Sequence, residues 1–102
     1  MKAIRGATTV AADTPEEIRG AVSELLAEIK RCNKLDEDDI VCVLFSNTAD
    51  IRSFYPAKAA REAGLSRAAL YSSLEPEIEG ALPLCIRVLL FAENCYSVRH
   101  VY

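Results

Sequence analysis

The spacing of apolar residues predicts one long amphipathic helix near the start of the chain, over residues 15–32. Its apolar positions recur at helical spacing and fall on one side of the helix: Ile18, Val22, Leu25, Leu26 and Ile29. Thr14 fits the capping position, Pro15 the first helical position, and Glu17 completes a capping box. These signals agree on where the helix begins.

Runs rich in aliphatic and β-branched residues predict the strands. The first, over residues 2–10, contains Gly6, and a glycine inside a strand often marks a bulge or the close approach of another group. The continuous apolar run 40–45 is typical of a strand covered on both faces. Further strands are predicted over residues 68–73, 85–92 and 98–102.

The remaining segments are predicted as one short helix and several loops. The helix begins at Pro56 and ends at Gly64, while residues 46–52 and 74–84 are loops. The order β-α-β-α-β-loop-β-β predicts an α/β (α+β) fold with a mixed sheet, in a single domain over residues 1–102. A chain of this length buries only ~65% of its unfolded surface, so an oligomeric interface would add to its core.

Charge and composition exclude several classes of function. A formal net charge of −3 favours neither nucleic acid nor an anionic membrane as partner. We expect no signal peptide and no membrane span, because no apolar run is long enough. The four cysteines form no CxxC pair and the chain has one histidine, which argues against a metal site. Reduced thiols in the cytoplasm are the expectation.

Two arginines, Arg5 and Arg87, lie inside predicted strands. Arg87 shares a face of run 85–92 with apolar residues, and an unpaired buried charge there would be costly. It is therefore a solvated residue of an edge strand, a partner in a structural ion pair, or a ligand-binding residue. Arg5 precedes Gly6, which could let a ligand approach. Two guanidinium groups on separate strands could seat a carboxylate or phosphate.

The other charged and aromatic residues have ordinary explanations when each is taken alone. Glu75 lies in an acidic loop, Lys58 and Arg61 are spaced for a hydrated helix face, and His100 and Tyr102 share one face of the last strand. From the residues alone, the prediction stops at a small α/β domain with a candidate anion site.

Four segments occur in one order along almost the whole chain: AIRGATTV, FYPAKAAREAG, LPLCIRVLL and RHVY. Together with the capped helix, they resemble the small trimeric α/β (AroH-type) class of chorismate mutase. The resemblance implies a ferredoxin-like mixed sheet with two main helices on one face, in a trimer that forms a pseudo α/β barrel. It also implies an isomerase that converts chorismate to prephenate by a Claisen rearrangement, on the route to phenylalanine and tyrosine, without a cofactor or a nucleophile.

The resemblance further implies a role for each candidate residue. Arg87 would contact the ether oxygen and a substrate carboxylate, Arg5 would clamp a carboxylate, and Glu75 would accept a hydrogen bond from the ring hydroxyl. The implied substrate-binding residues are Tyr102, Arg61, Tyr55, Lys58 and Ser72. The substrate, chorismate, would bind between subunits of a homotrimer.

Two departures from the family pattern modify these expectations. Ser72 stands where better-known members carry a cysteine, although a serine can still hydrogen-bond. The sequence stops at Tyr102, where relatives continue into a tail that supplies another arginine, so we expect a raised KM more than a lowered kcat. Two alternatives stay open: a catalytically weak binding or regulatory module on the same scaffold, and an unrelated deaminase-like trimer, which the motif matches disfavour.

Overall fold

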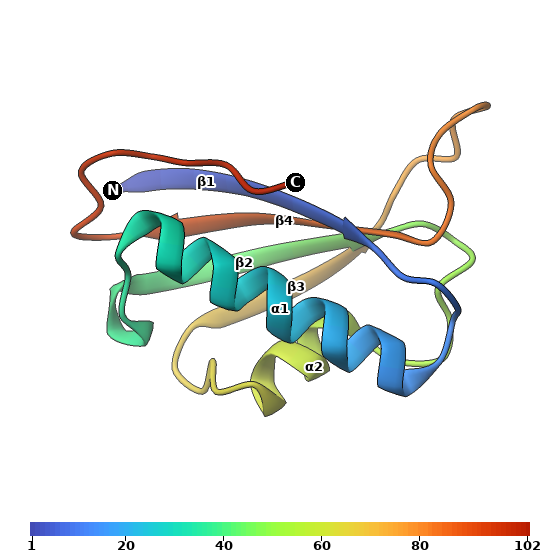
Figure 1. Ribbon diagram of the computed structural model, residues 1–102, viewed down its shortest axis with the longest axis horizontal. Coiled ribbons are helices and arrows are strands. Elements are labelled where there is room, and N and C mark those ends of the chain that lie inside the picture. The colour runs from blue at the N-terminus through green and yellow to red at the C-terminus, as the bar shows by residue number, and fades with distance from the viewer.

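A computed structural model describes residues 1–102 as a four-stranded sheet with two helices on one of its faces (Figure 1). The predicted α/β (α+β) fold is confirmed, with both helices on one face. The elements in chain order are β1 (Lys2–Thr9), α1 (Pro15–Asn33), a short 3-10 turn η1 (Glu37–Asp39), β2 (Ile40–Asn47), α2 (Pro56–Glu62), β3 (Ala69–Leu74) and β4 (Cys85–Ala92).

The sheet is mixed, with strand order β1-β4-β2-β3. β4 runs antiparallel to both β1 and β2, whereas β2 and β3 are parallel and joined by a crossover through α2. Side chains alternate along each strand, so one face packs against the helices. That face and the helices share one apolar core, whose most buried members are Ile4, Ile18, Val22, Ile29, Val43, Phe45, Leu65, Ile86 and Leu90.

Helix α1 begins where the local signals predict. The Thr14 side chain accepts a hydrogen bond from the Glu17 backbone N–H at 3.2 Å, and Pro15 occupies the first helical position. The helix runs one residue beyond the prediction, and Asn33 is its last residue. Lys34 caps it with a left-handed φ of 54°. No helix in the structure has the length and apolar character needed to span a membrane.

Gly6 lies under α1, and helix packing explains the glycine. A Cβ added to Gly6 would lie 2.9 Å from Cδ1 of Ile29, 3.1 Å from Cγ2 of Val88 and 3.2 Å from Cδ1 of Leu25. The space that the sequence analysis assigned to an approaching ligand is therefore filled by core side chains. Arg5, the residue before Gly6 in the strand, projects from the opposite face.

Two predicted boundaries differ from the structure. The sequence predicts a loop from residue 46, but β2 continues through Asn47 because Ser46 pairs with both Arg87 of β4 and Ser73 of β3. The predicted final strand over residues 98–102 is wrong, since only Val101 joins the sheet, in a single bridge to Gly6. Beside that bridge, the Arg5 N–H donates to the His100 side chain, and both backbone groups of Arg99 bind the Asn33 side chain. A regular strand would use backbone partners in these places.

The sheet face away from the helices, which we call the open face, is not covered in this chain. Cys42 and Leu44 of β2 are half-buried on this face, so the expectation that run 40–45 is covered on both faces stays a prediction that this chain alone does not fulfil. Leu89 and Phe91 of β4 are also half-buried, and Tyr71 of β3 is exposed. The open face is thus a largely apolar surface, and Arg5 and Arg87 project from it.

Candidate active site

Arg5 and Arg87 project from neighbouring strands on the open face. Arg5 pairs with Leu89, and Ala7 pairs with Arg87, so the two arginines are diagonal neighbours across β1 and β4. The Cα atoms of diagonal neighbours on one face of an antiparallel pair lie about 7 Å apart, which is within reach of long side chains. Both residues are exposed in the chain. Two guanidinium groups at this separation can bind one small dianion together.

Glu75 lies beside Arg87, immediately after the last residue of β3. The Arg87 Nε and the Glu75 Oε1 are 3.4 Å apart. The Ser46 hydroxyl donates to the same oxygen at 2.7 Å, and the Glu75 backbone N–H donates to the Asn47 carbonyl at 2.9 Å. The Glu75 side chain is only 22% exposed. Two groups therefore hold the carboxylate at Oε1, and the backbone bond fixes the residue that carries it. The pair uses the Nε of the guanidinium and leaves its Nη donors for a ligand.

Ser46 belongs to the site although the sequence analysis did not identify it. The apolar run of β2 ends at Phe45, so the polar residue after it was assigned to a loop. A signal was present, because strand alternation from Leu44 places Ser46 on the same face. Its pairing opposite Arg87 depends on long-range register, which the sequence does not reveal.

Tyr102 lines a hollow of about 350 Å³ on the open face together with both arginines. The other open-face residues of this hollow are Leu44, Ser46, Ser73 and Leu89. Its volume suits a small ligand, since such sites start at about 300 Å³. The structure therefore brings Arg5, Arg87 and Tyr102 together, with Glu75 ion-paired to Arg87.

The thiol nearest this group is Cys85, two residues before Arg87. Burial raises the pKa of the Cys85 thiol, although the Arg87 charge opposes that shift. The neutral thiol is a poor nucleophile. Cys85 therefore contributes to the site as a small buried side chain, as expected for the free cysteines.

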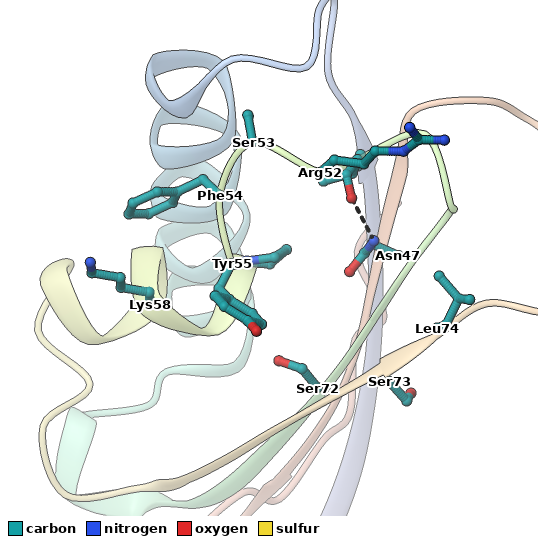
Figure 2. A pocket seen from close by; sticks show the side chains of 11 residues that line it. Asn47, Arg52, Ser53, Phe54, Tyr55, Lys58, Ser72, Ser73 and Leu74 are labelled. Carbon is teal, nitrogen blue, oxygen red and sulfur yellow. Dashed lines mark hydrogen bonds between the residues drawn. The ribbon is translucent and has the colours of Figure 1, made fainter.

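Tyr55, Lys58 and Ser72 form a second group, in a hollow of about 520 Å³ between the start of α2 and β3 (Figure 2). Tyr55 immediately precedes α2 and is 70% exposed. Figure 2 shows the Tyr55 ring and the Ser72 hydroxyl directed toward one another. The Lys58 ammonium lies 5.4 Å from the centre of the Phe54 ring. Each of these side chains reaches the second hollow and none reaches the first.

Edge strand β3 separates the two hollows within one chain. Ser72 points to the helix side of the strand and lines the second hollow, whereas Ser46 and Arg87 line the first. Ser73 is shared by both linings. The candidate residues thus form two groups that one chain does not place around a single ligand.

Arg61 belongs to neither hollow. Its Nη1 donates to the Leu65 carbonyl at 2.7 Å, and its Nη2 donates to the Ala68 carbonyl at 3.3 Å. The guanidinium therefore holds the turn between α2 and β3. The Arg61 guanidinium still places a positive charge at that turn, but two of its N–H donors are bound to backbone carbonyls.

Comparison with known proteins identifies the family of the chain. The family model for chorismate mutase type I matches residues 1–102. The chain belongs to the type I chorismate mutase family. It is 41% identical to chorismate mutase AroH of Thermus thermophilus, over 100% of this chain and 87% of that protein. It is 38% identical to chorismate mutase AroH of Bacillus subtilis (strain 168), over 100% of this chain and 84% of that protein.

A solved structure agrees with the sequence comparison. Chorismate mutase from Clostridium thermocellum matches with a TM-score of 0.95 and 39% sequence identity, covering 100% of this chain and 94% of that chain. The resemblance inferred from the four motifs is confirmed, and the alternative of an unrelated deaminase-like protein is excluded. Chorismate mutases of this family are isomerases.

Proposed function

We propose that the protein isomerises chorismate to prephenate, with Arg87, Glu75 and Arg5 as its catalytic residues. The observation that carries the residue assignment is their placement: both arginines project from the open face, and Glu75 forms an ion pair with Arg87. The reaction is an intramolecular Claisen rearrangement, in which a C–O bond breaks as a C–C bond forms. No proton transfer or covalent intermediate is required, so catalysis comes from holding the substrate and matching its developing charge.

Arg87 is assigned to the breaking bond. Negative charge builds up on the ether oxygen as the C–O bond lengthens, and a fixed cation there stabilises the transition state more than the ground state. Arg87 lies on β4 between two paired strands, and Glu75 holds its Nε. This preorganisation is what electrostatic catalysis requires, because the donors need no rearrangement during the reaction.

Glu75 and Arg5 are assigned to the two ends of the substrate. The Glu75 carboxylate keeps lone pairs that can accept a hydrogen bond from the ring hydroxyl, and it faces the positive charge that spreads over the ring. The Arg5 fork matches a carboxylate bidentately, and Tyr102 can donate to the same group. Chorismate carries two carboxylates, which suits two arginines on one face.

The same proposal includes a homotrimer with sites between subunits. Tyr55, Lys58, Ser72 and Arg61 would then complete the site of a neighbouring subunit as substrate-binding residues. The separation of the two hollows supports this assignment, as does the apolar open face, which a partner could cover. We further propose that residues 1–102 form one domain, supported by their single core, and that the protein is cytoplasmic, supported by its free cysteines.

The test is the loss of chorismate absorbance, with prephenate confirmed by its conversion to phenylpyruvate in acid. Wild type is expected to turn over, and Arg87→Ala is expected to lose activity while keeping its fold and oligomeric state. The function fails if the folded wild type does not consume chorismate. The assignment of Arg87 fails if the folded variant is as active as wild type.

A further inference from the structure

Asn33, the last residue of α1, is the only buried polar residue of the chain. Its side-chain amide is fully used. Nδ2 donates to the Ile29 carbonyl at 2.9 Å and to the Arg99 carbonyl at 2.9 Å, and Oδ1 accepts from the Arg99 backbone N–H at 2.7 Å. A buried amide is costly unless it is paired, and this one pairs with both backbone groups of a single residue 66 positions away. Asn33 therefore holds the chain at Arg99.

The residues after Arg99 are held at the outer edge of β1, where Figure 1 shows the C-terminal end running beside that strand. The Val101 N–H donates to the Arg5 carbonyl at 3.0 Å, and the Ala7 N–H donates to the Val101 carbonyl at 2.8 Å. The Arg5 N–H donates to Nδ1 of His100 at 3.0 Å. We call residues 99–102 the edge segment. Tyr102 comes next after Val101, so these bonds fix the place from which it lines the hollow of Arg5 and Arg87.

We propose that Asn33 is a positioning residue for substrate binding, acting through the edge segment on Tyr102, with His100 as the second attachment. This inference rests on the proposed function of the site. Asn33 lines neither hollow, and it touches the segment only through Arg99. Apart from the Asn33 and His100 side chains, the segment is attached by the two hydrogen bonds of a single bridge and by the Val101 side chain, which packs against the core.

The proposal predicts a specific kinetic effect. In Asn33→Ala the Arg99 backbone loses both partners, and Tyr102 occupies the hollow for less of the time. Because Arg87 and Glu75 are held by β2 and β4, their geometry does not depend on Asn33. We expect KM for chorismate to rise about tenfold, as the loss of two modest hydrogen bonds implies, with kcat changed less than about twofold.

A matched control separates positioning from a general loss of stability. Thr14→Ala removes the cap at the opposite end of the same helix, far along the chain from the edge segment. It should lower stability and leave KM unchanged. If Thr14→Ala raises KM as much as Asn33→Ala does, the effect of Asn33 is only structural and the proposal is wrong.

A double-mutant cycle tests whether Asn33 acts through Tyr102. If it does, adding Asn33→Ala to Tyr102→Ala should change KM by less than about twofold, because the ring that Asn33 positions is already absent. Independent, multiplying effects would contradict the proposal. His100→Ala should likewise raise KM, whereas His100→Asn offers an acceptor for the Arg5 N–H and should restore it at least partly. If Asn33→Ala does not fold, the two His100 variants still test whether the attachment of the edge segment controls KM.

Amide hydrogen exchange gives a readout that is independent of activity. The Arg99 and Val101 amides should exchange faster in Asn33→Ala, while those of β4 keep their wild-type protection. Unchanged exchange in the edge segment would overturn the inference even if KM rises. A wild type inactive on chorismate would instead refute the proposed function, and the exchange result would still show whether Asn33 holds the segment.

Discussion

Arg87 and Tyr102 line the same hollow but are attached to the protein in different ways. Arg87 sits within β4, with regular strand pairing on both sides and Glu75 holding its guanidinium. Tyr102 ends a segment held by one bridge and by the side chains of Asn33 and His100. The rigid attachment suits a residue that must match a transition state, whereas the lighter one suits a residue that captures substrate. On the proposed roles of these residues, we expect changes at Arg87 to act mainly on kcat and changes in the edge segment to act mainly on KM.

The largest effect is expected from Arg87→Lys, which keeps the charge but loses the fork and the Nε contact with Glu75. We expect kcat to fall by about 10²–10³-fold, the cost of losing one preorganised donor. Stopped-flow or steady-state assays at saturating chorismate measure it, with circular dichroism as the folding control. Nearly full kcat in this variant would show that charge alone suffices and that strand geometry matters little.

A smaller effect is expected from Ser46→Ala, which removes the hydroxyl that holds Glu75 at 2.7 Å. Because the Glu75 side chain is mostly buried and charged, losing this bond should lower kcat about tenfold and leave KM nearly unchanged. Ser73→Ala is the matched control, since that hydroxyl donates to the Phe45 carbonyl and not to Glu75. Equal losses of kcat in the two variants would show that the Ser46 hydroxyl has no specific role in holding Glu75.

Gly6→Ala tests whether the glycine beside Arg5 serves packing or ligand access. The added Cβ would meet the Ile29, Leu25 and Val88 side chains in the core. We therefore expect the free energy of unfolding to fall by about 1 kcal/mol. KM should stay within about twofold of wild type. Urea denaturation and saturation kinetics measure the two quantities. A raised KM with unchanged stability would mean that the glycine makes room for substrate after all.

The smallest effect concerns Asp13, which holds the loop before Tyr55 in the second hollow. The backbone N–H and hydroxyl of Ser53 and the backbone N–H of Arg52 all donate to this carboxylate and hold its pKa below the usual range. A lowered folded-state pKa stabilises the fold above the ordinary value of about 3.9, and that contribution is lost as pH falls below it.

Asp13→Asn should therefore reduce the loss of stability between neutral pH and about pH 3, as measured by urea midpoints at each pH. The pH dependence of stability will not vanish in the variant, because hydrogen bonds also lower the pKa of Asp50, chiefly one from the Thr48 hydroxyl. An identical pH profile in wild type and Asp13→Asn would show that this loop contributes no pH-dependent stability.

The fold was predictable where local pattern decides it. The capped start of α1 at Thr14 and the apolar run of β4 both appear in the sequence as they do in the structure. The edge segment was not predictable as an irregular stretch, because its shape depends on Asn33, 66 residues away, and on the side chain of His100. Local propensity contains no information about such long-range contacts.

The candidate site was predictable only in part. Arg5 and Arg87 stand out because charges inside strands need a reason, but their diagonal placement follows from strand register. Ser46 was missed because it follows the apolar run 40–45, and the end of that run was taken as the end of the strand. The division of the candidate residues between two hollows depends on which side of β3 each one faces, and that required the tertiary structure.

The most direct test of the comparison is to measure complete saturation curves for Arg87→Ala and Tyr102→Ala beside wild type, in one assay with chorismate. The account predicts that Arg87→Ala loses mainly kcat and that Tyr102→Ala mainly raises KM while keeping most of the wild-type kcat. A kcat that collapses in folded Tyr102→Ala, or an Arg87→Ala that differs from wild type in KM alone, would contradict it.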